Sequence, residues 1–371
     1  MSRIEVVRLY RVAMPLVTPW GSDVGRESSI ESVLLNLVTT DHSVWSEVTP
    51  HAAPIYTPEW AGGVVSCLRD FLVPELFRCP SLEPAAVGTR LQKFKGNDYA
   101  HGAIDIALWL LKAKTCDQSL AQVVGVNKDS TRVGEALGRE ASIDHLLKKI
   151  QAAIDQGYAR VKLKYGPGWD FAMLSAVRGT YPHFPLHIDC NGAYDESEIA
   201  NLAKLDQFNL LMIEQPFAAD DLLSHVGLAK VAQTPICIDE SVTSLDVVRT
   251  AVTLGACQWV HLKPGRIGGL SAVKKIHDFC VSENVACAIG SDLSSAIGEQ
   301  IVVAASLLPG VKLATAAFPS GRLYPQELAT EPLQFHRDSE GFLVVRVDGF
   351  REPNDEILQK WCVEKIELRP S

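Results

Sequence analysis

Five charged residues recur at nearly equal intervals through the middle of the chain. Each one ends a short apolar run, and the successive intervals of 25, 25, 25 and 24 residues separate Lys164, Asp189, Glu214, Asp239 and Lys263. If each apolar run is a strand, these side chains occupy equivalent positions in successive strand–helix units and meet at one end of them. Carboxylates placed between two lysines could hold a divalent cation and transfer a proton.

The three acidic residues of this series predict a metal site. Carboxylates that are brought together without a counter-charge repel one another and raise one another's pKa, and a divalent cation removes that penalty. Asp189, Glu214 and Asp239 offer only oxygen, with no His or Cys at the equivalent positions, which suits Mg²⁺ or Mn²⁺ better than Zn²⁺. The alternative is three separate helix-capping or salt-bridged carboxylates, for which an even series flanked by lysines is unusual.

The stretch RVKLKYGPG, residues 160–168, places two lysines in a strand that should be buried. Residues i and i+2 of a strand share a face, so Lys162 and Lys164 should both point into the interior, while Lys263 approaches from the far side. A lysine buried near a metal and other cations can have its pKa lowered toward neutrality and act as a general base. The alternative is that these lysines only neutralise the acidic residues.

The elements that carry these residues predict a barrel. From about residue 130, apolar runs alternate with helical patterns, and each run is continuous, as in parallel strands buried on both faces. The runs are 133–138, 160–165, 185–189, 210–214, 235–239, 259–263 and 285–290, with 311–315 as a candidate eighth. Successive parallel strands joined by helices favour a modified (β/α) TIM barrel over an open doubly wound sheet, and catalytic groups of such barrels lie at the carboxyl ends of the strands.

The remaining segments predict a second domain around the barrel. Two long strands of a hairpin are expected at 2–17 and 30–48, and helices at 59–78, 83–94 and 97–116. We therefore divide the chain into an N-terminal α+β capping domain (1–125), the barrel (126–327) and a C-terminal segment (328–371) that packs back on barrel and cap.

Composition narrows the class of protein. The 371 residues are 47% apolar and 21% charged, which is typical of a globular protein. A net charge of −9, with no basic run longer than two lysines, argues against nucleic-acid binding. The sequence shows neither a signal peptide nor a membrane span, so we expect a cytoplasmic protein, and we interpret the nine cysteines as reduced core thiols.

Five ordered motifs give the chain a family resemblance. They are VKLKYG at 161–166, DCNG at 189–192, IEQP at 213–216, DES at 239–241 and KPGRIGG at 263–269. This set resembles the muconate-lactonizing-enzyme subgroup of the enolase superfamily, and the resemblance covers nearly the whole chain. It implies abstraction of a proton α to a carboxylate, with an enediolate intermediate stabilised by Mg²⁺, a pairing of base and metal that is known for the superfamily.

The resemblance also implies roles for individual residues. Asp189, Glu214 and Asp239 would be the metal ligands, and Lys164 and Lys263 the two acid/base groups. Lys162 would add positive charge near the carboxylate of a small substrate, while Asn191 and Glu240 would support the metal and Lys263. Such capped barrels are often homo-oligomers, so the resemblance makes a homo-oligomer the expectation here.

Within the subgroup, KPGRIGG together with TPEWAGG (57–63) and DFLVPEL (70–76) is most similar to the o-succinylbenzoate synthase and N-acylamino acid racemase branch. The implied reaction is a β-elimination of water in the menaquinone pathway. The alternatives are racemisation or epimerisation of N-acylamino acids or dipeptides, and a cycloisomerisation of the muconate type. A barrel that binds a ligand without turnover is a third hypothesis, which the intact lysines and carboxylates disfavour.

Some stretches depart from this branch and should line the substrate side. IGSDLSS (289–295) holds Ser294 where the branch has a glutamate, and we expect Ser291 and Asp292 to contact substrate, unless Asp292 is a helix N-cap or a solvated loop acid. The first barrel strand carries Glu135 where small polar residues are more usual. Trp20, in the hairpin loop, should close the mouth and touch substrate, unless it is an exposed loop tip.

Overall fold

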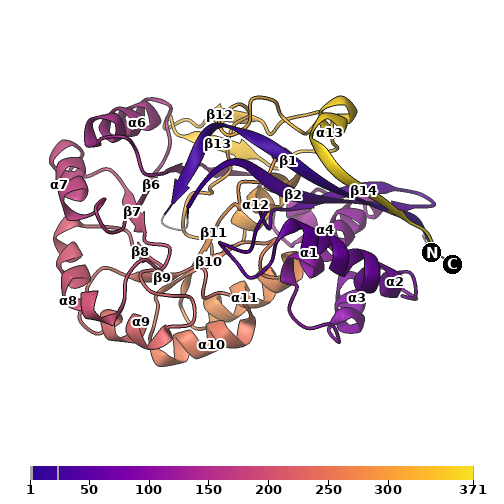
Figure 1. Cartoon of the computed structure of the whole chain (residues 1–371), viewed down its shortest axis with the longest axis horizontal. Coiled ribbons are helices and arrows are strands. Elements are labelled where there is room, and N and C mark those ends of the chain that lie inside the picture. Colours follow the sequence, from indigo (N-terminus) through magenta and orange to yellow (C-terminus); the bar gives the residue numbers. More distant parts are fainter. Residues whose placement is uncertain (1–2, 23–24, 371) are drawn as a thin grey trace.

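Seven parallel strands form a curled sheet at the centre of the molecule, shown in a computed structural model that describes residues 3–22 and 25–370 (Figure 1). Neighbouring strands follow chain order, namely β5 (Glu135–Leu137), β6 (Val161–Lys164), β7 (Leu186–Asp189), β8 (Ile213–Glu214), β9 (Ile236–Ile238), β10 (Trp259–Leu262) and β11 (Ala286–Ile289). The barrel expected from the repeated apolar runs is confirmed. Register pairs Lys164 with Asp189 and Asp189 with Glu214, so the charged residues stand side by side at the strand ends.

The expected eighth strand at 311–315 is reduced to two isolated bridges. Val311 pairs with Cys287 beside β11, and Thr315 pairs with Val133 just before β5. These two contacts close the ring between the last and first strands of the sheet.

Helices cover the outside of the barrel (Figure 1). They are α6 (Ile143–Asp155), α7 (Phe171–Thr180), the 3-10 helix η2 (Glu196–Glu198), α8 (Ile199–Leu202), the 3-10 helix η3 (Ala203–Phe208), α9 (Leu222–Ala229), α10 (Leu245–Leu254), α11 (Leu270–Ser282) and α12 (Ala296–Ser306). Serine N-caps begin three of them, because the hydroxyls of Ser142, Ser244 and Ser295 accept backbone N–H bonds that the first turn leaves unpaired.

The N-terminal region forms an antiparallel sheet with helices against it. Its elements are β1 (Ile4–Ser22), β2 (Gly25–Thr39), β3 (Ser43–Val48), α1 (Ala61–Cys67), the π-helix η1 (Leu68–Leu72), α2 (Val73–Leu76), α3 (Pro84–Leu91), α4 (Asp98–Thr115) and α5 (Leu120–Val123). The single strand expected at 30–48 is wrong. A turn, in which Thr39 N–H donates to His42 O at 2.8 Å, divides it into β2 and β3. The β1–β2 hairpin reaches over the barrel, and its residues 23 and 24 lie outside the described residues (Figure 1).

The C-terminal region returns to earlier parts of the chain. β12 (Phe335–Arg337) and β13 (Leu343–Arg346) form a small sheet with β4 (Ser130–Arg132). After α13 (Asp355–Trp361), β14 (Cys362–Leu368) pairs antiparallel with β1. The last strand of the chain therefore becomes an edge of the N-terminal sheet.

Helix α4 fixes the segment that follows β10. A Cβ on Gly102 of α4 would come within 2.6 Å of the backbone oxygen of Gly265, so helix and loop backbone are in close contact. In the same helix, Asp105 accepts a hydrogen bond of 2.9 Å from Ser271 N–H at the start of α11. Helix α4 of the N-terminal region thus packs directly against the loop that begins with Lys263.

Two expectations from composition have structural outcomes. Among the described residues, no helix combines the length and apolar character that a membrane span requires. Six of the nine cysteines are buried, but Cys116 is exposed, so the expectation of core thiols is correct for only part of the set.

Candidate active site

The five charged residues of the regular series meet at one end of the barrel. Lys164, Asp189 and Glu214 are the last residues of β6, β7 and β8, while Asp239 and Lys263 follow β9 and β10 directly. All five are buried, and the lysines retain only 6% and 8% of their surface. Charges so deprived of water must compensate one another.

Lys162 and Lys164 share one carboxylate. Asp189 Oδ2 lies 2.9 Å from Lys162 Nζ and 2.8 Å from Lys164 Nζ, and Lys162 also reaches Glu214 Oε1 at 3.0 Å. Lys164 Nζ donates in addition to Asn191 Oδ1. The two lysines therefore lie on the inner face of β6, as their spacing of two predicted.

Lys263 approaches from the other side and has a different carboxylate. Its Nζ lies 3.1 Å from Asp239 Oδ2, and Arg266 Nη2 lies 2.7 Å from Asp239 Oδ1. The hydroxyl of Tyr56 lies 2.5 Å from Lys263 Nζ and accepts a hydrogen bond from it. Each lysine that was expected to act on substrate is thus paired with its own aspartate.

The protein's own charges raise, rather than lower, the pKa of Lys162 and of Lys263. The predicted lowering, which supposes a bound metal, stays a prediction. Burial alone lowers the pKa of Lys162, but the charges of Asp189 and Glu214 outweigh burial and raise the pKa. The pKa of Lys263 is likewise lowered by burial and raised, in net effect, by Asp239 and Asp292. The physical reason is that carboxylates, not cations, are the nearest charges to both groups.

The two supporting residues predicted by the resemblance lie in one chain of contacts. Asn191, in a left-handed backbone conformation, donates from Nδ2 to Glu240 Oε1 at 2.8 Å and accepts from Lys164. Asn191 therefore contacts Lys164 rather than Lys263. Burial, with the nearby charges of Asp239 and Asp189, raises the pKa of Glu240 to about 7.

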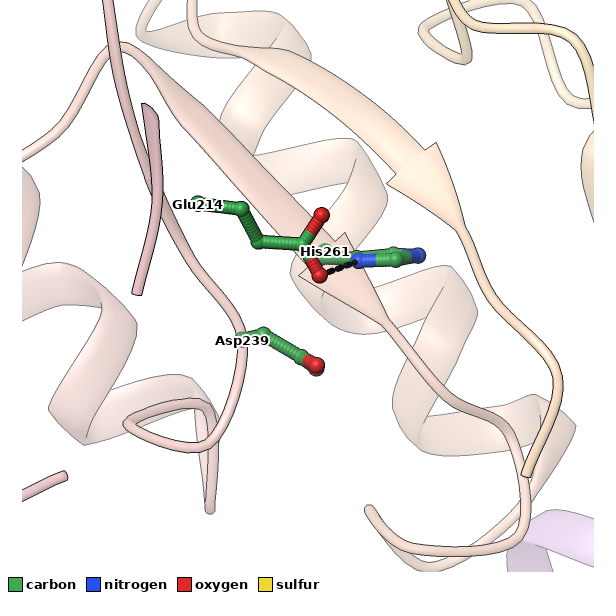
Figure 2. Close-up of side chains that lie close together, drawn as sticks. All are labelled: Glu214, Asp239 and His261. Atoms are coloured by element: carbon green, nitrogen blue, oxygen red, sulfur yellow. Dashed lines mark hydrogen bonds and ion pairs between the residues drawn. The ribbon is translucent and has the colours of Figure 1, made fainter. Parts of the chain in front are cut away.

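The acidic residues fit a hard divalent cation. Glu214 Oε2 is a buried oxygen that makes no hydrogen bond within the described residues. Ligand atoms of Glu214, Asp239 and His261 lie within 4.8 Å of one another. Figure 2 shows these three side chains close together. Asp189, the third expected ligand, faces the two ammonium groups of β6. The carboxylate oxygens of Glu214 and Asp239 suit Mg²⁺ or Mn²⁺, whereas an imidazole nitrogen is not a ligand that Mg²⁺ prefers.

A cavity between barrel and cap opens onto these groups. Its lining includes Lys162, Lys164, Asp189, Asn191, His261 and Lys263 from the barrel and Trp20, Glu27, His51 and Tyr56 from the cap. Trp20 is therefore not an exposed loop tip. It pairs in register with Glu27 across the hairpin, which brings both side chains to the mouth of the cavity.

The departing loop after β11 also lines this cavity. Asp292 Oδ1 lies 3.5 Å from Lys263 Nζ, and Tyr99 OH lies 3.4 Å from Asp292 Oδ2. The side chain of Asp292 is 7% exposed, and the N-cap of α12 is Ser295, so Asp292 is neither a solvated loop acid nor the cap of that helix. Ser291 lines the cavity and donates its hydroxyl proton to Glu299.

Two family models match the chain. The N-terminal domain model of mandelate racemase / muconate lactonizing enzyme matches residues 6–125, and the enolase C-terminal domain-like model matches residues 145–348. The chain belongs to the enolase superfamily. Its place there makes it a lyase or an isomerase, since its relatives are named as synthases or racemases.

Relatives of both kinds cover most of the chain. An N-succinylamino acid racemase from an Amycolatopsis species is 37% identical over 89% of this chain and 90% of the relative. An o-succinylbenzoate synthase from Bacillus subtilis is 33% identical over 98% of each. A crystal structure of an enolase superfamily member from Listeria innocua superposes with a TM-score of 0.93, with 27% identity over the full length of both chains. Muconate lactonizing enzyme from Pseudomonas fluorescens shares the fold, with a TM-score of 0.90 over 97% of this chain and 99% of that one, at 22% identity.

Sequence reasoning missed two residues that line this cavity, His261 and Tyr56. His261 stands two residues before Lys263 on the same face of β10, and its Nδ1 lies 2.8 Å from Glu214 Oε1. The spacing rule that linked Lys162 to Lys164 would have found it. Tyr56 comes from the loop between β3 and α1, and no pattern in the sequence connects it with the barrel.

Glu135 does not line the substrate side. Its neighbour Ala136 faces the cavity, whereas Glu135 turns away and pairs with Arg322, whose Nη2 lies 3.1 Å from Oε1. Adjacent residues of a strand point to opposite faces, so only one of the two can face the interior. Glu135 is therefore a buried ion-pair partner outside the cavity.

Proposed function

We propose that this protein removes the proton α to the carboxylate of a small substrate and eliminates water from the resulting enediolate, as an o-succinylbenzoate synthase. One observation carries the proposal, namely two lysine ammonium groups that face one cavity, each held by a different aspartate. A substrate that enters between the two lysines would contact one lysine that can accept a proton and another that carries positive charge. The names of several relatives support dehydration as the reaction.

Each residue has a part in this proposal. Lys164, as the free amine, takes the α-proton, and Asp189 and Asn191 hold its nitrogen in place. When the C–O bond to the β-hydroxyl group breaks, the Lys164 ammonium returns this proton to the departing oxygen, so that water leaves and the amine is restored. Lys162 supplies positive charge for the substrate carboxylate, on which negative charge grows as the C–H bond breaks. Lys263 stabilises the same charge from the opposite side. Trp20, Ser291 and Asp292 bind the rest of the substrate and keep bulk water from the reacting carbon.

Asp189, Glu214 and Asp239 would hold Mg²⁺, or Mn²⁺, supported by Asn191 and Glu240. When bound, the cation supplies charge neutralisation for the carboxylates and for the developing dianion. The homo-oligomer and the cytoplasmic location stay predictions from the sequence, as do the boundaries at residues 125 and 327.

Racemisation of an N-succinylamino acid is the second candidate function. Lys263 lies in the same cavity as Lys164 and could return a proton to the face opposite the one from which it was removed. The relative from Amycolatopsis, named as an N-succinylamino acid racemase, supports this candidate. Dipeptide epimerisation and muconate-type cycloisomerisation are represented by structures under 25% identical, which share only the fold.

The test compares the two reactions in D₂O. The purified protein, loaded with Mg²⁺, is incubated with the synthase substrate and separately with N-succinylamino acids. Formation of the aromatic product, abolished in Lys164→Ala, supports the synthase. Exchange of the α-proton for deuterium with loss of optical rotation supports the racemase. Absence of both reactions would refute the proposal.

A further inference from the structure

Tyr56 belongs to the cap, yet its hydroxyl contacts three charged groups of the barrel. It accepts hydrogen bonds from Lys263 Nζ at 2.5 Å and Arg266 Nη1 at 2.8 Å, and it donates to Asp239 Oδ2 at 3.3 Å. The ring lies under the same lysine, with Nζ 4.7 Å from the ring centroid. A single cap side chain thus joins the loop after β3 to the strand ends of β9 and β10.

The hydrogen-bonding capacity of this hydroxyl is fully used. A phenol offers one proton and two lone pairs, and the three contacts occupy all of them. A phenol has a pKa of about 10, so the hydroxyl keeps its proton at neutral pH. Arg266 uses one lone pair of Tyr56, and Asp239 accepts its proton. Only the second lone pair is therefore left to accept from Lys263.

The two lysines differ in where their support comes from. Lys164 is held by Asp189 and Asn191, both barrel residues at the end of β7. Lys263 has Asp239 from the barrel at 3.1 Å and Tyr56 from the cap at 2.5 Å. Removing the cap contact would leave the Lys164 side of the cavity intact and loosen only the Lys263 side.

We propose that Tyr56 is a positioning residue that aims Lys263 at one face of the substrate α-carbon. This rests on the second candidate function, racemisation, because it requires the two lysines to act on opposite faces. As a free amine, Lys263 has two N–H bonds and one lone pair. Tyr56 accepts one N–H and Asp239 the other, so the lone pair is the position on the nitrogen that is left for the substrate in the cavity. When the amine takes the α-proton, the C–H electron pair passes to the substrate carboxylate group and a third N–H bond forms.

Tyr56→Phe tests this by removing the hydroxyl and keeping the ring. The α-proton exchange of each enantiomer of an N-succinylamino acid is followed by NMR in D₂O with Mg²⁺. Lys263→Ala and Lys164→Ala identify which enantiomer each lysine serves. We expect Tyr56→Phe to slow exchange of the Lys263-dependent enantiomer about 10- to 100-fold. Exchange of the other enantiomer should change less than about threefold. Equal loss for both enantiomers, or loss for neither, would overturn the proposal.

Tyr181→Phe is the matched control. It loses a hydroxyl that donates to Leu147 O at 2.9 Å, away from the cavity, and should leave both exchange rates unchanged.

A second measurement needs no turnover. Proton–nitrogen spectra of lysine ammonium groups, with the Lys263 signal assigned by its loss in Lys263→Met, report how fast that ammonium exchanges with water. We expect protection in the parent protein and faster exchange in Tyr56→Phe. Equal protection of the Lys263 ammonium in the parent protein and in Tyr56→Phe would refute the positioning role of Tyr56. If the parent protein exchanges neither enantiomer, the racemase candidate fails, while this measurement still decides the role of Tyr56.

Discussion

The imidazole of His261 holds the carboxylate of Glu214 inside the barrel, with Nδ1 2.8 Å from Oε1 (Figure 2). Both side chains are buried, so water does not compete for this bond. The other nitrogen of the ring, Nε2, lies against Gly290, where a Cβ would approach it to 2.3 Å. The ring therefore links the end of β8 to the residue that follows β11.

Loss of the imidazole should weaken cation binding. In His261→Ala, Glu214 loses the bond that orients its carboxylate, and we expect the dissociation constant of Mg²⁺ or Mn²⁺ to rise about 10- to 100-fold. Titration calorimetry measures this directly. His183→Ala, which changes an exposed histidine, should bind as the parent protein does. An unchanged constant in His261→Ala would contradict the role assigned to this bond.

Gly290→Ala should produce the same defect through steric displacement. The added methyl group would overlap His261 Nε2, so the ring must move away from Glu214. We expect cation affinity to fall about tenfold in the single variant. In the double variant with His261→Ala, the added methyl group has space. Gly290→Ala should then lower the cation affinity little further. Full additivity of the two changes would show that Gly290 acts independently of the ring.

Two variants should distinguish the effect of losing a metal ligand from the effect of losing the base. Asp239→Asn removes one negative charge from a buried site in which Lys263 and Arg266 remain, so both cation affinity and activity should be lost. Lys164→Ala should lose activity by about 100- to 10,000-fold while binding the cation normally. Chelation with EDTA should abolish activity reversibly. Retained activity in Asp239→Asn would disprove the proposed metal site.

Glu299 should make stability depend on pH. Burial raises its pKa from 4.5 to about 8, although hydrogen bonds from Ser291 and Ser294 oppose the shift. The folded state therefore holds a proton that the unfolded chain releases above about pH 4.5. The contribution of Glu299 to the free energy of unfolding is fully present below that pH, falls as the pH rises to about 8, and then stays constant.

The variant Glu299→Gln removes this dependence. We expect the variant to gain stability relative to the parent protein on going from pH 5 to pH 9, by at most about 4 kcal/mol. Urea unfolding at several pH values measures the difference. Glu283→Gln, at an exposed position, serves as the control. A difference between variant and parent that does not vary with pH would refute the assignment.

The barrel and its charged strand ends were predictable because they follow local rules. Continuous apolar runs indicate strands buried on both faces, and an equal interval brings residues such as Asp189 and Glu214 to neighbouring strand ends. The spacing of Lys162 and Lys164 sets their common face in the same way. His261 obeys this rule as well, and its omission was an error of application.

Other features depended on contacts that no local rule encodes. The nearest charges to Lys162 and Lys263 are the carboxylates of Asp189, Glu214 and Asp239, and these raise the pKa of both lysines. Spacing along the chain does not reveal which charges lie nearest. Arg322, 187 residues away in sequence, pairs with Glu135, and spacing along the chain does not reveal this contact.

The sequence alone therefore determined that Lys162 and Lys164 share the inner face of one strand, and in what order the strands follow. Tertiary structure alone decided which cap residues meet them. Tyr56 lies 207 residues from Lys263 along the chain, and only the docking of the cap on the barrel brings the two within 2.5 Å. The periodicity of strands and helices sets the direction of a side chain, whereas the packing of whole domains sets its distant partners.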